Sequence, residues 1–261
     1  MSLEDDTIYI LREAYAEFHN PAILWSMGKD STTLLYMTRK AFLGSIPFPV
    51  IHIDTGHKFP QMYQFRDWLA DEWELDLVIS MSDAVTANIG PEVGKLICCN
   101  LLKTKALKDT LEQYKFDALI LAIRRDEHGI RAKERVFSPR EQDFSWDYQH
   151  QPLEMWNQYQ SVLDVGNHMR IHPILQWREI DVWKYIREYG IPVNPLYFSN
   201  GTHRYRSLGC MPCTNPIEST AGTIDEIVEE LVDTKVAERS GRAQDKEDSF
   251  TMQKLRALGY M

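Results

Sequence analysis

Short apolar runs alternate with longer segments of helical pattern in the first two thirds of the chain. The apolar runs, rich in β-branched residues, are typical of buried strands and cover 21–25, 50–53, 75–79 and 118–122. Helical patterns precede and separate them, at 4–18, 32–42, 61–73 and 99–114. Strands separated by such helices predict βαβ units, and therefore an α/β fold with a mostly parallel sheet and helices on both faces.

The pattern changes after residue 136. Residues 137–168 are polar and aromatic without a clean period, so we expect a long irregular excursion over the sheet, a type of segment that usually carries function. Further on we expect a fifth strand at 171–174, a helix at 180–189, a cysteine-containing loop at 207–215, and helices at 223–239 and 249–258. The sequence thus predicts a five-stranded, Rossmann-like domain over residues 1–200, with the cysteine loop and a helical C-terminal segment over 201–261 packed on it.

Composition and charge restrict the class of protein. Of the 261 residues, 44% are hydrophobic and 26% charged, which excludes a largely disordered chain. No apolar run approaches the roughly 18–20 residues of a membrane-spanning helix, and the first residues are acidic where a secretory signal would be basic. We therefore expect a cytoplasmic protein without a membrane partner. The net charge of −9 disfavours non-specific binding of nucleic acid, although a local basic groove is compatible with it.

The segment after the first strand carries groups that bind phosphate. It runs Ser26-Met-Gly-Lys-Asp-Ser31 and leads directly into a helix. It therefore offers a glycine for close backbone approach, two hydroxyls, a lysine and the free N–H groups of a helix N-terminus. The two glycines of the Walker pattern are missing. On these residues alone, a phosphate loop and a capped strand–helix turn are equally good interpretations.

This Ser-x-Gly-Lys-Asp-Ser loop resembles the pyrophosphate loop of the N-type ATP pyrophosphatases, which cleave ATP between its α and β phosphates and leave an adenylated acceptor. Three further segments resemble the small, catalytic subunit of bacterial sulfate adenylyltransferase, in the same superfamily as PAPS reductase. They are His52–Phe59 with its Asp-Thr-Gly, the arginine-rich 124–135, and Glu-Arg-Ser-Gly-Arg at 238–242. The resemblance covers nearly the whole chain and implies an adenine nucleotide alpha hydrolase-like fold and ATP-dependent adenylation.

The resemblance also implies the roles of individual residues. The residues expected to hold the β and γ phosphates of ATP are Ser26, Gly28, Lys29, Asp30 and Ser31. Those expected near the nucleotide are Asp54, which would help to position Mg²⁺, and Gly56. The residues expected around the α-phosphate and the acceptor oxyanion are Arg124, Arg125, Arg131 and Lys133. Fixed cations suit this place because in-line attack at phosphorus spreads negative charge. The candidate catalytic residues are Lys29, Asp30, Arg125 and Arg131.

The four cysteines form two pairs, Cys98-Cys99 and Cys210-Met-Pro-Cys213. In a cytosolic chain such thiols are more often metal ligands or redox groups than disulfides. The arrangement resembles the 4Fe–4S motif of adenylylsulfate reductases, which sulfate-adenylylating subunits generally lack, and it implies a cluster bound by all four thiolates. A zinc site, which adjacent cysteines suit poorly, a redox-active Cys-x-x-Cys pair and unligated core thiols remain alternatives.

Two enzymatic functions are compatible with these features. We place first an ATP pyrophosphatase for iron–sulfur-dependent sulfur insertion, such as DNA phosphorothioation. It would take sulfur from a donor such as a cysteine desulfurase and reach a nucleic-acid acceptor through partner proteins. The alternative is a sulfate adenylyltransferase small subunit, which makes adenylylsulfate from ATP and sulfate beside a GTPase subunit. A short segment between Tyr197 and Cys210 argues against docking to that GTPase.

Two other functions rank lower. The final residues, Leu-Arg-Ala-Leu-Gly-Tyr-Met, contain no cysteine, so we do not expect a sulfonucleotide reductase, whose mechanism needs that nucleophile. A cluster-bearing scaffold or sensor that binds ATP without cleaving it is the non-enzymatic alternative. Each of these functions is compatible with a homo-oligomer.

Overall fold

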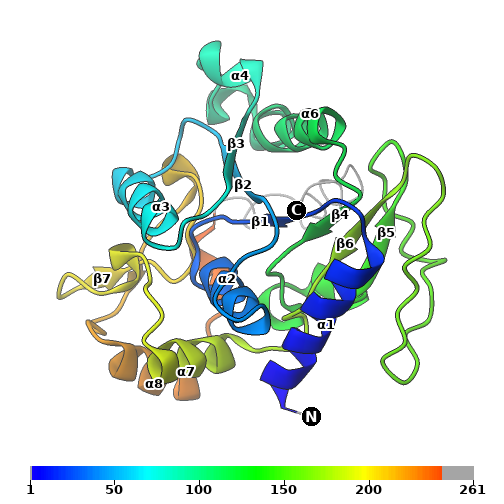
Figure 1. Cartoon of the computed structure of the whole chain (residues 1–261). Coiled ribbons are helices and arrows are strands. Elements are labelled where there is room, and N and C mark those ends of the chain that lie inside the picture. Colours follow the sequence, from blue (N-terminus) through cyan, green and yellow to red (C-terminus); the bar gives the residue numbers. More distant parts are fainter. Residues whose placement is uncertain (1, 243–261) are drawn as a thin grey trace.

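The computed structural model, shown in Figure 1, describes residues 2–242. Its centre is a six-stranded sheet in the order β3-β2-β1-β4-β6-β5. All neighbouring strands pair in parallel except β5, which is antiparallel to β6. The strands are β1 (Pro21–Leu24), β2 (Val50–Asp54), β3 (Leu77–Met81), β4 (Ala118–Ile120), β5 (Phe137–Arg140) and β6 (His168–Ile171). The predicted α/β class with a mostly parallel sheet is confirmed.

Helices cover both faces of the sheet. Figure 1 shows α1, α2 and α7 below it and α4 and α6 above it. The helices are α1 (Leu3–Glu17), α2 (Lys29–Ala41), α3 (Pro60–Glu72), α4 (Asp83–Thr86), α5 (Lys95–Cys99), α6 (Lys105–Tyr114), α7 (Glu179–Tyr189) and α8 (Ile224–Asp233). The strands β1, β2, β4 and β6 are buried along their whole length, because the helices shield both faces. This explains why their sequences are continuous apolar runs rather than alternating ones.

The structure differs from the predicted elements at the outer edge of the sheet. Residues 137–140 form β5 instead of belonging to the irregular excursion, so the sheet has six strands and not five. Strand β6 begins at His168, three residues before the predicted 171–174. Polar residues and a proline hid both strands: β6 contains the buried His168 and Arg170, and β5 contains Pro139 and the buried Arg140, whereas the prediction required apolar runs. The helix predicted at 249–258 lies outside the described residues.

Strand β5 leaves few hydrogen-bond donors on its free edge. The N–H of His172 donates to the carbonyl of Val136 at 2.8 Å. Because donors alternate along an antiparallel pair, Phe137 and Pro139 are the positions whose N–H would point away from β6. Pro139 has no N–H, and the N–H of Phe137 donates to the carboxylate of Glu154 at 2.8 Å. Neither position offers a free donor to another strand.

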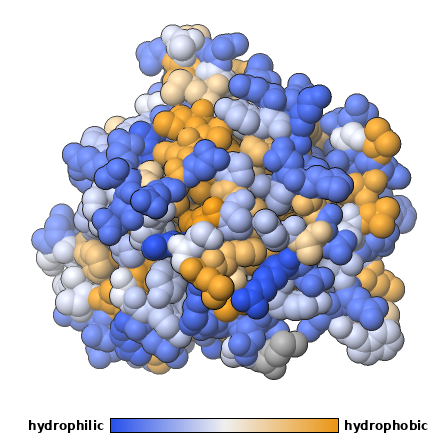
Figure 2. Space-filling model, in the orientation of Figure 1, coloured by the Kyte–Doolittle hydropathy of each residue, from blue (hydrophilic) through white to orange (hydrophobic). Residues whose placement is uncertain are grey.

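The remaining segments pack around this sheet. Residues 141–167 contain no helix or strand and expose several apolar side chains, which include Leu153, Trp156, Val162 and Val165. Figure 2 shows the corresponding apolar patches at the right of the molecule. A small antiparallel sheet of β7 (His203–Arg204) and β8 (Ile217–Glu218) flanks the cysteine loop, and a 3₁₀ turn, η7 (Glu238–Gly241), follows α8. No described helix is long and apolar enough to cross a membrane.

Candidate active site

A cavity opens beyond the carboxyl ends of β1, β2 and β4, which is where parallel sheets of this kind bind ligands. Apolar residues at the strand ends form one wall, among them Trp25, Ile53 and Ile123. The phosphate-loop segment lines it with Ser26, Gly28, Lys29, Asp30 and Ser31. Residues distant in the sequence complete the lining, namely Lys58, Lys103, Glu127, Arg131, Tyr197, Glu238, Arg239 and Arg242. The cavity therefore collects the predicted phosphate loop and many cations around an apolar wall.

The loop between β1 and α2 has a tightly fixed backbone. Ser31 Oγ lies 3.1 Å from Ser26 Oγ and accepts the N–H of Ser26 at 3.2 Å. Met27 takes the left-handed conformation at φ 61°, which is uncommon for a residue other than glycine and is typical of strained functional sites. Gly28 has an ordinary φ of −81°. An added Cβ would lie 3.3 Å from both Ser26 Oγ and the Tyr197 hydroxyl, so there is little room for a side chain here.

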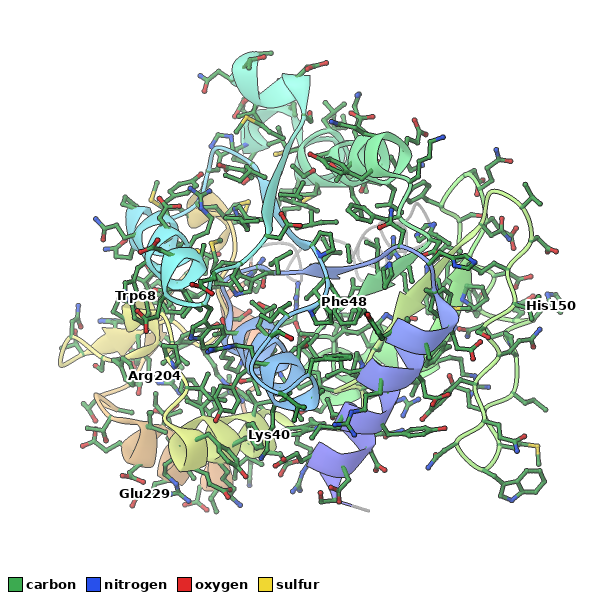
Figure 3. All side chains as sticks on the ribbon, viewed as in Figure 1. Lys40, Phe48, Trp68, His150, Arg204 and Glu229 are labelled. Atoms are coloured by element: carbon green, nitrogen blue, oxygen red, sulfur yellow. The ribbon has the colours of Figure 1, made fainter. Side chains whose placement is uncertain are left out.

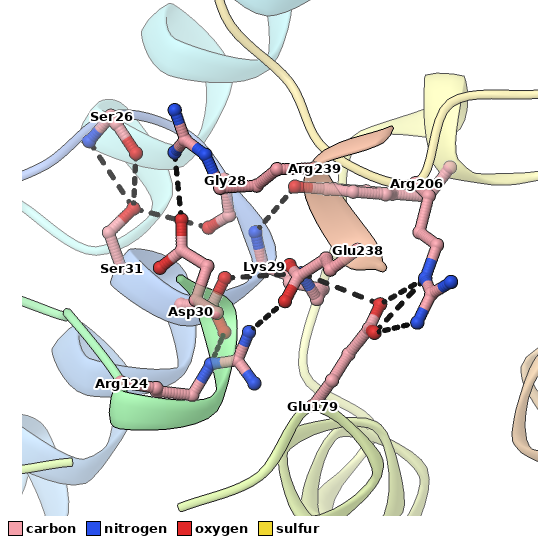
Figure 4. Close-up of polar contacts among 12 residues, drawn as sticks. Ser26, Gly28, Lys29, Asp30, Ser31, Arg124, Glu179, Arg206, Glu238 and Arg239 are labelled. Carbon is pink, nitrogen blue, oxygen red and sulfur yellow. Dashed lines mark hydrogen bonds and ion pairs between the residues drawn. The ribbon is translucent and has the colours of Figure 1, made fainter. Parts of the chain in front are cut away.

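Lys29 and Arg124 are buried inside a network of carboxylates (Figure 4). Lys29 Nζ contacts Glu238 and lies 3.2 Å from Asp30. Arg124 contacts Glu238, Asp30 at 2.8 Å and Asp126 at 2.9 Å. Burial disfavours the charge on Lys29, but Asp30 and Glu238 outweigh that effect and raise its pKa above the ordinary value. Both cations are therefore permanently charged and already neutralised by the protein.

A second ion pair extends this network outward. Glu179, at the start of α7, lies 3.9 Å from Lys29 Nζ. Its carboxylate accepts both Nε and Nη2 of Arg206, the closer contact at 2.7 Å. No role was predicted for Glu179, Arg206 or Glu238, because Glu179 and Glu238 reach Lys29 across more than 100 residues and Arg206 joins the network through Glu179. The only signal for Glu238 was its place in the Glu-Arg-Ser-Gly-Arg segment.

A group of cations occupies another part of the cavity. Burial lowers the pKa of Lys58 to about 8; the cations Lys103 and Arg242 contribute to this, while the Cys210 thiol opposes it. A cation whose pKa is lowered by neighbouring cations lies in a positive potential, which a bound anion relieves. Lys58 and Lys103 were not among the predicted site residues, although Lys58 lies within the Asp-Thr-Gly segment.

The structure separates the predicted arginine cluster. Arg131 lines the cavity and contacts Glu127, which also accepts from Arg239 at 3.0 Å. Arg124 lies in the carboxylate network described above. Arg125 does not line the cavity: its guanidinium donates to the carbonyl of Glu134 at 3.0 Å. Lys133 is exposed, and its Nζ lies 4.1 Å from the ring centre of Tyr148.

The predicted Mg²⁺ residue Asp54 also lies outside the cavity lining. Its carboxylate accepts the N–H of Gly56 at 2.8 Å and the hydroxyl of Tyr63 at 2.7 Å. Arg66 lies 3.8 Å away. These contacts shape the turn after β2, where Gly56 has a φ of 69° and an added Cβ would lie 2.9 Å from Val85. The role in Mg²⁺ binding given to Asp54 stays a prediction.

The four cysteines meet in a small pocket beside the cavity. Cys98 and Cys99 at the end of α5 line it together with Cys210 and Cys213, and all four are buried. Lys103 lines both this pocket and the larger cavity. Burial, reinforced by the other three thiols, raises the pKa of Cys98 to about 11. Burial also disfavours the Cys210 thiolate, but Lys103, Lys58 and a contact with Thr55 lower its pKa to about 6.

The four thiols of this pocket can be compared with the two metal groups that cysteines commonly bind. Zinc–sulfur bonds of about 2.3 Å hold four sulfurs in one tight tetrahedron. Among residues 2–242, no three His, Cys, Asp or Glu side chains are placed to hold a metal ion. A 4Fe–4S cluster binds each cysteine through a different iron and so needs more widely spaced sulfurs. Four buried thiols beside the cation Lys103 fit that group in number and in charge.

Comparisons with known proteins agree with this geometry. Residues 20–216 match the phosphoadenosine phosphosulfate reductase domain. Sulfate adenylyltransferase subunit 2 of Pseudomonas aeruginosa is 40% identical over 294 residues, which cover 99% of this chain and 96% of that protein. The protein of the same name from Allorhizobium ampelinum is 39% identical over 291 residues, with 99% and 92% covered.

Solved structures share the fold. The phosphoadenylyl-sulfate reductase of Candida auris aligns with a TM-score of 0.56 at 20% identity, over 81% of this chain and 90% of that one. The FMN adenylyltransferase of Candida glabrata in complex with ATP aligns with a TM-score of 0.57 at 17% identity, over 82% and 62%. The interpretation ranked first from the sequence, sulfur insertion such as DNA phosphorothioation with a cysteine desulfurase and a nucleic-acid acceptor, finds no support among these proteins.

Proposed function

The chain belongs to the phosphoadenosine phosphosulfate reductase domain family, and from this premise we propose that it is the catalytic subunit of a sulfate adenylyltransferase. The enzyme would join the AMP part of ATP to sulfate and release pyrophosphate. Its relatives confirm the predicted class of ATP-dependent adenylyltransferase. The observation that carries the proposal is a single cavity with a phosphate-binding loop in one part and a group of cations in another.

The cavity suggests how the two substrates lie. The β and γ phosphates bind at the N-terminus of α2, where first-turn N–H groups have no acceptor within the helix, beside the hydroxyls of Ser26 and Ser31. The apolar wall at the strand ends takes the adenosine. Sulfate, a small dianion, binds where Lys58, Lys103 and Arg242 create a positive potential. In this proposal the acceptor lies on the opposite side of the α-phosphate from the leaving pyrophosphate, as in-line attack requires.

The reaction follows from this arrangement. A sulfate oxygen attacks the α-phosphorus, the bond from that phosphorus to the bridging oxygen of the β-phosphate breaks, and pyrophosphate leaves with the electron pair. Negative charge increases on the oxygens around phosphorus during attack, and Arg131 and Arg239 at the cavity wall stabilise it. Adenylylsulfate lies far uphill of ATP and sulfate, so the reaction needs coupling to a second subunit. The name of the relatives, subunit 2, agrees with such a partner, which we expect to be a GTPase.

The test is an oxyanion-dependent adenylation assay with the purified chain. Molybdate in place of sulfate gives an adenylate that hydrolyses at once, so AMP and pyrophosphate accumulate without coupling. We expect AMP formation to require molybdate and to be inhibited by sulfate. In the variant Lys58→Gln the KM for molybdate should rise about tenfold or more, because one of three cations is lost. AMP formation at a rate that depends on neither molybdate nor sulfate would overturn the proposal.

One observation favours a second function, in which the chain inserts sulfur with the help of an iron–sulfur cluster. The four cysteines share a pocket that adjoins the ATP cavity through Lys103, and sulfate adenylylation makes no use of them. Cys98, Cys99, Cys210 and Cys213 would hold the cluster. Anaerobic purification followed by iron and acid-labile sulfide analysis tests this: about four irons per chain, lost in Cys98→Ser and Cys213→Ser, would favour sulfur insertion. Metal-free protein with titratable thiols would exclude it.

A further inference from the structure

Glu238 connects the end of the described chain to the phosphate loop. Its side chain is buried, and its two carboxylate oxygens contact different cations, one Lys29 and the other Arg124. Lys29 is the first residue of α2, and Arg124 follows β4. Figure 4 shows the Glu238 carboxylate between these two side chains. One carboxylate thus joins three segments that are far apart in the sequence.

The residues after Glu238 are attached to two other walls of the cavity. Arg239 donates to Glu127 at 3.0 Å. The carbonyl of Gly241 accepts the N–H of Asn215 at 2.9 Å, and Arg242 forms a β-bridge with Thr214 in the cysteine loop. We call residues 238–242 the arginine segment. It crosses the cavity from the phosphate loop to the cysteine loop and contributes Arg239 and Arg242 to the lining.

Glu238 is the innermost of these attachments. Arg206, which pairs with Glu179, donates to the carbonyl of Val236 at 2.7 Å just before the segment, and Glu238 is the side chain that attaches the segment itself to Lys29 and Arg124. Glu238 and Arg239 are adjacent in the chain, so the contacts of Glu238 also restrict the backbone position of Arg239. The carboxylate does not need to leave when phosphates bind, because loop N–H groups and hydroxyls are the expected phosphate ligands. Its contribution concerns the acceptor end of the cavity.

We infer that Glu238 is a positioning residue: it fastens the arginine segment to Lys29 and Arg124 and thereby holds Arg239 where the α-phosphate is attacked and Arg242 where the acceptor anion binds. The assignment of the anion rests on the proposed function. The attachment itself does not, and it has consequences that are measurable without turnover. A merely structural Glu238 would affect ATP and the acceptor alike, whereas a positioning residue affects the acceptor selectively.

The variant Glu238→Gln tests the inference, with Glu229→Gln as the matched control. Glu229 lies on the exposed face of α8 and points into solvent (Figure 3). Hydrogen exchange of peptides that cover 237–242 should accelerate about tenfold or more in Glu238→Gln and stay unchanged in the control. Unchanged exchange in Glu238→Gln would overturn the attachment, whether or not the chain adenylates sulfate.

Kinetics test the consequence for the acceptor. In Glu238→Gln we expect the KM for molybdate to rise about tenfold to a hundredfold, while the Kd for ATP stays within about twofold. Glu238→Asp, which keeps the charge, should restore part of the loss. Equal weakening of ATP and molybdate, or no effect on either, would overturn the inference. Wild-type protein without molybdate-dependent turnover would overturn the proposed function and leave the exchange experiment as the test of the attachment.

A second variant displaces the segment without touching the carboxylate. A Cβ added to Gly241 would lie 2.5 Å from the carbonyl oxygen of Asn215, so Gly241→Ala must push the arginine segment away from the cysteine loop. We expect it to raise the KM for molybdate as Glu238→Gln does, again with little change for ATP. If Glu238→Gln fails to fold, this variant decides: an unaltered KM for molybdate contradicts the role of the segment.

Discussion

The Tyr197 hydroxyl accepts a hydrogen bond of 2.9 Å from the backbone N–H of Lys29, across 168 positions of the chain. Tyr197 is itself fully buried and stacks edge-on against Trp183 of α7. The hydroxyl would also lie 3.3 Å from a Cβ added at Gly28. The phosphate loop is therefore shaped by an aromatic residue from the second half of the chain as well as by its own sequence.

Replacement of Tyr197 by Phe should destabilise the protein. The variant keeps the ring but leaves the buried N–H of Lys29 without its acceptor, which costs about 1–3 kcal/mol. Urea unfolding followed by circular dichroism measures the change in the free energy of unfolding. The control is Tyr114→Phe, since Tyr114 is exposed and should lose less than about 0.5 kcal/mol. Equal stability of the two variants would contradict the importance of this hydrogen bond.

The variant Lys29→Met should lose more stability than a variant of any exposed lysine. Removal of the Lys29 ammonium group leaves the carboxylates of Asp30 and Glu238 with one cation fewer, and breaking a buried ion pair costs about 3–5 kcal/mol. Lys133→Gln is the comparison, because Lys133 was also predicted as a site residue but is exposed on the excursion side of the molecule. It should change the free energy of unfolding by less than about 0.5 kcal/mol and leave adenylation unaffected. A large effect of Lys133→Gln on turnover would contradict this expectation and show that Lys133 takes part in the reaction.

Gly209 gives a selective way to move one arginine. A Cβ at this position would overlap the guanidinium of Arg242, and a flexible side-chain end can yield where a backbone atom cannot. Gly209→Ala should therefore weaken binding of the acceptor anion with a loss of unfolding free energy below about 1 kcal/mol. Gly241→Ala, which meets a backbone oxygen, should lose about 1–3 kcal/mol. Calorimetric melting of both variants distinguishes these outcomes, and a reversed order would contradict the geometry.

Stability should decrease in mild acid, and His52, like the buried His168 and His172, contributes to that decrease. Burial lowers the pKa of His52 to about 4, while Nδ1 donates to the carbonyl of Trp25 at 3.2 Å. The unfolded chain protonates this residue near pH 6.5, so between pH 6.5 and 4 it binds more protons than the folded chain. The free energy of unfolding therefore falls as the pH is lowered through this window, by as much as about 3 kcal/mol. His52→Gln should flatten the slope, whereas His203→Gln, at an exposed position, should not.

The sequence was informative where a pattern of residues is typical of one structural element. The apolar runs located β1, β2 and β4, and the Ser-x-Gly-Lys-Asp-Ser loop indicated where the cavity opens. The sequence was less informative about which partners a charged side chain contacts. From the sequence, Lys29 looks like a phosphate ligand. In the structure its ammonium group contacts the carboxylate of Glu238, which lies 209 residues further along the chain. Periodicity contains no information about such a contact.

Buried polar residues explain most of the other differences. Arg125 follows Arg124 directly, yet only Arg124 joins the network, because neighbouring residues after a strand point in different directions. Lys103 belongs to a helical pattern and carries no motif, so its place between two pockets becomes visible only in three dimensions. The division of the chain near residue 200 stays a prediction, as do the catalytic roles given to Asp30, Arg125 and Arg131.

The edge formed by β5 affects how the protein behaves at high concentration. An exposed strand normally invites a strand of another molecule, and such pairing is a common beginning of aggregation. Here Pro139 removes one outward donor and Glu154 occupies the one at Phe137. A strand of a second copy could therefore not receive hydrogen bonds from Phe137 or Pro139, and the Glu154 carboxylate would lie beside it. This edge of the sheet thus disfavours the addition of another strand, and with it self-association through β5.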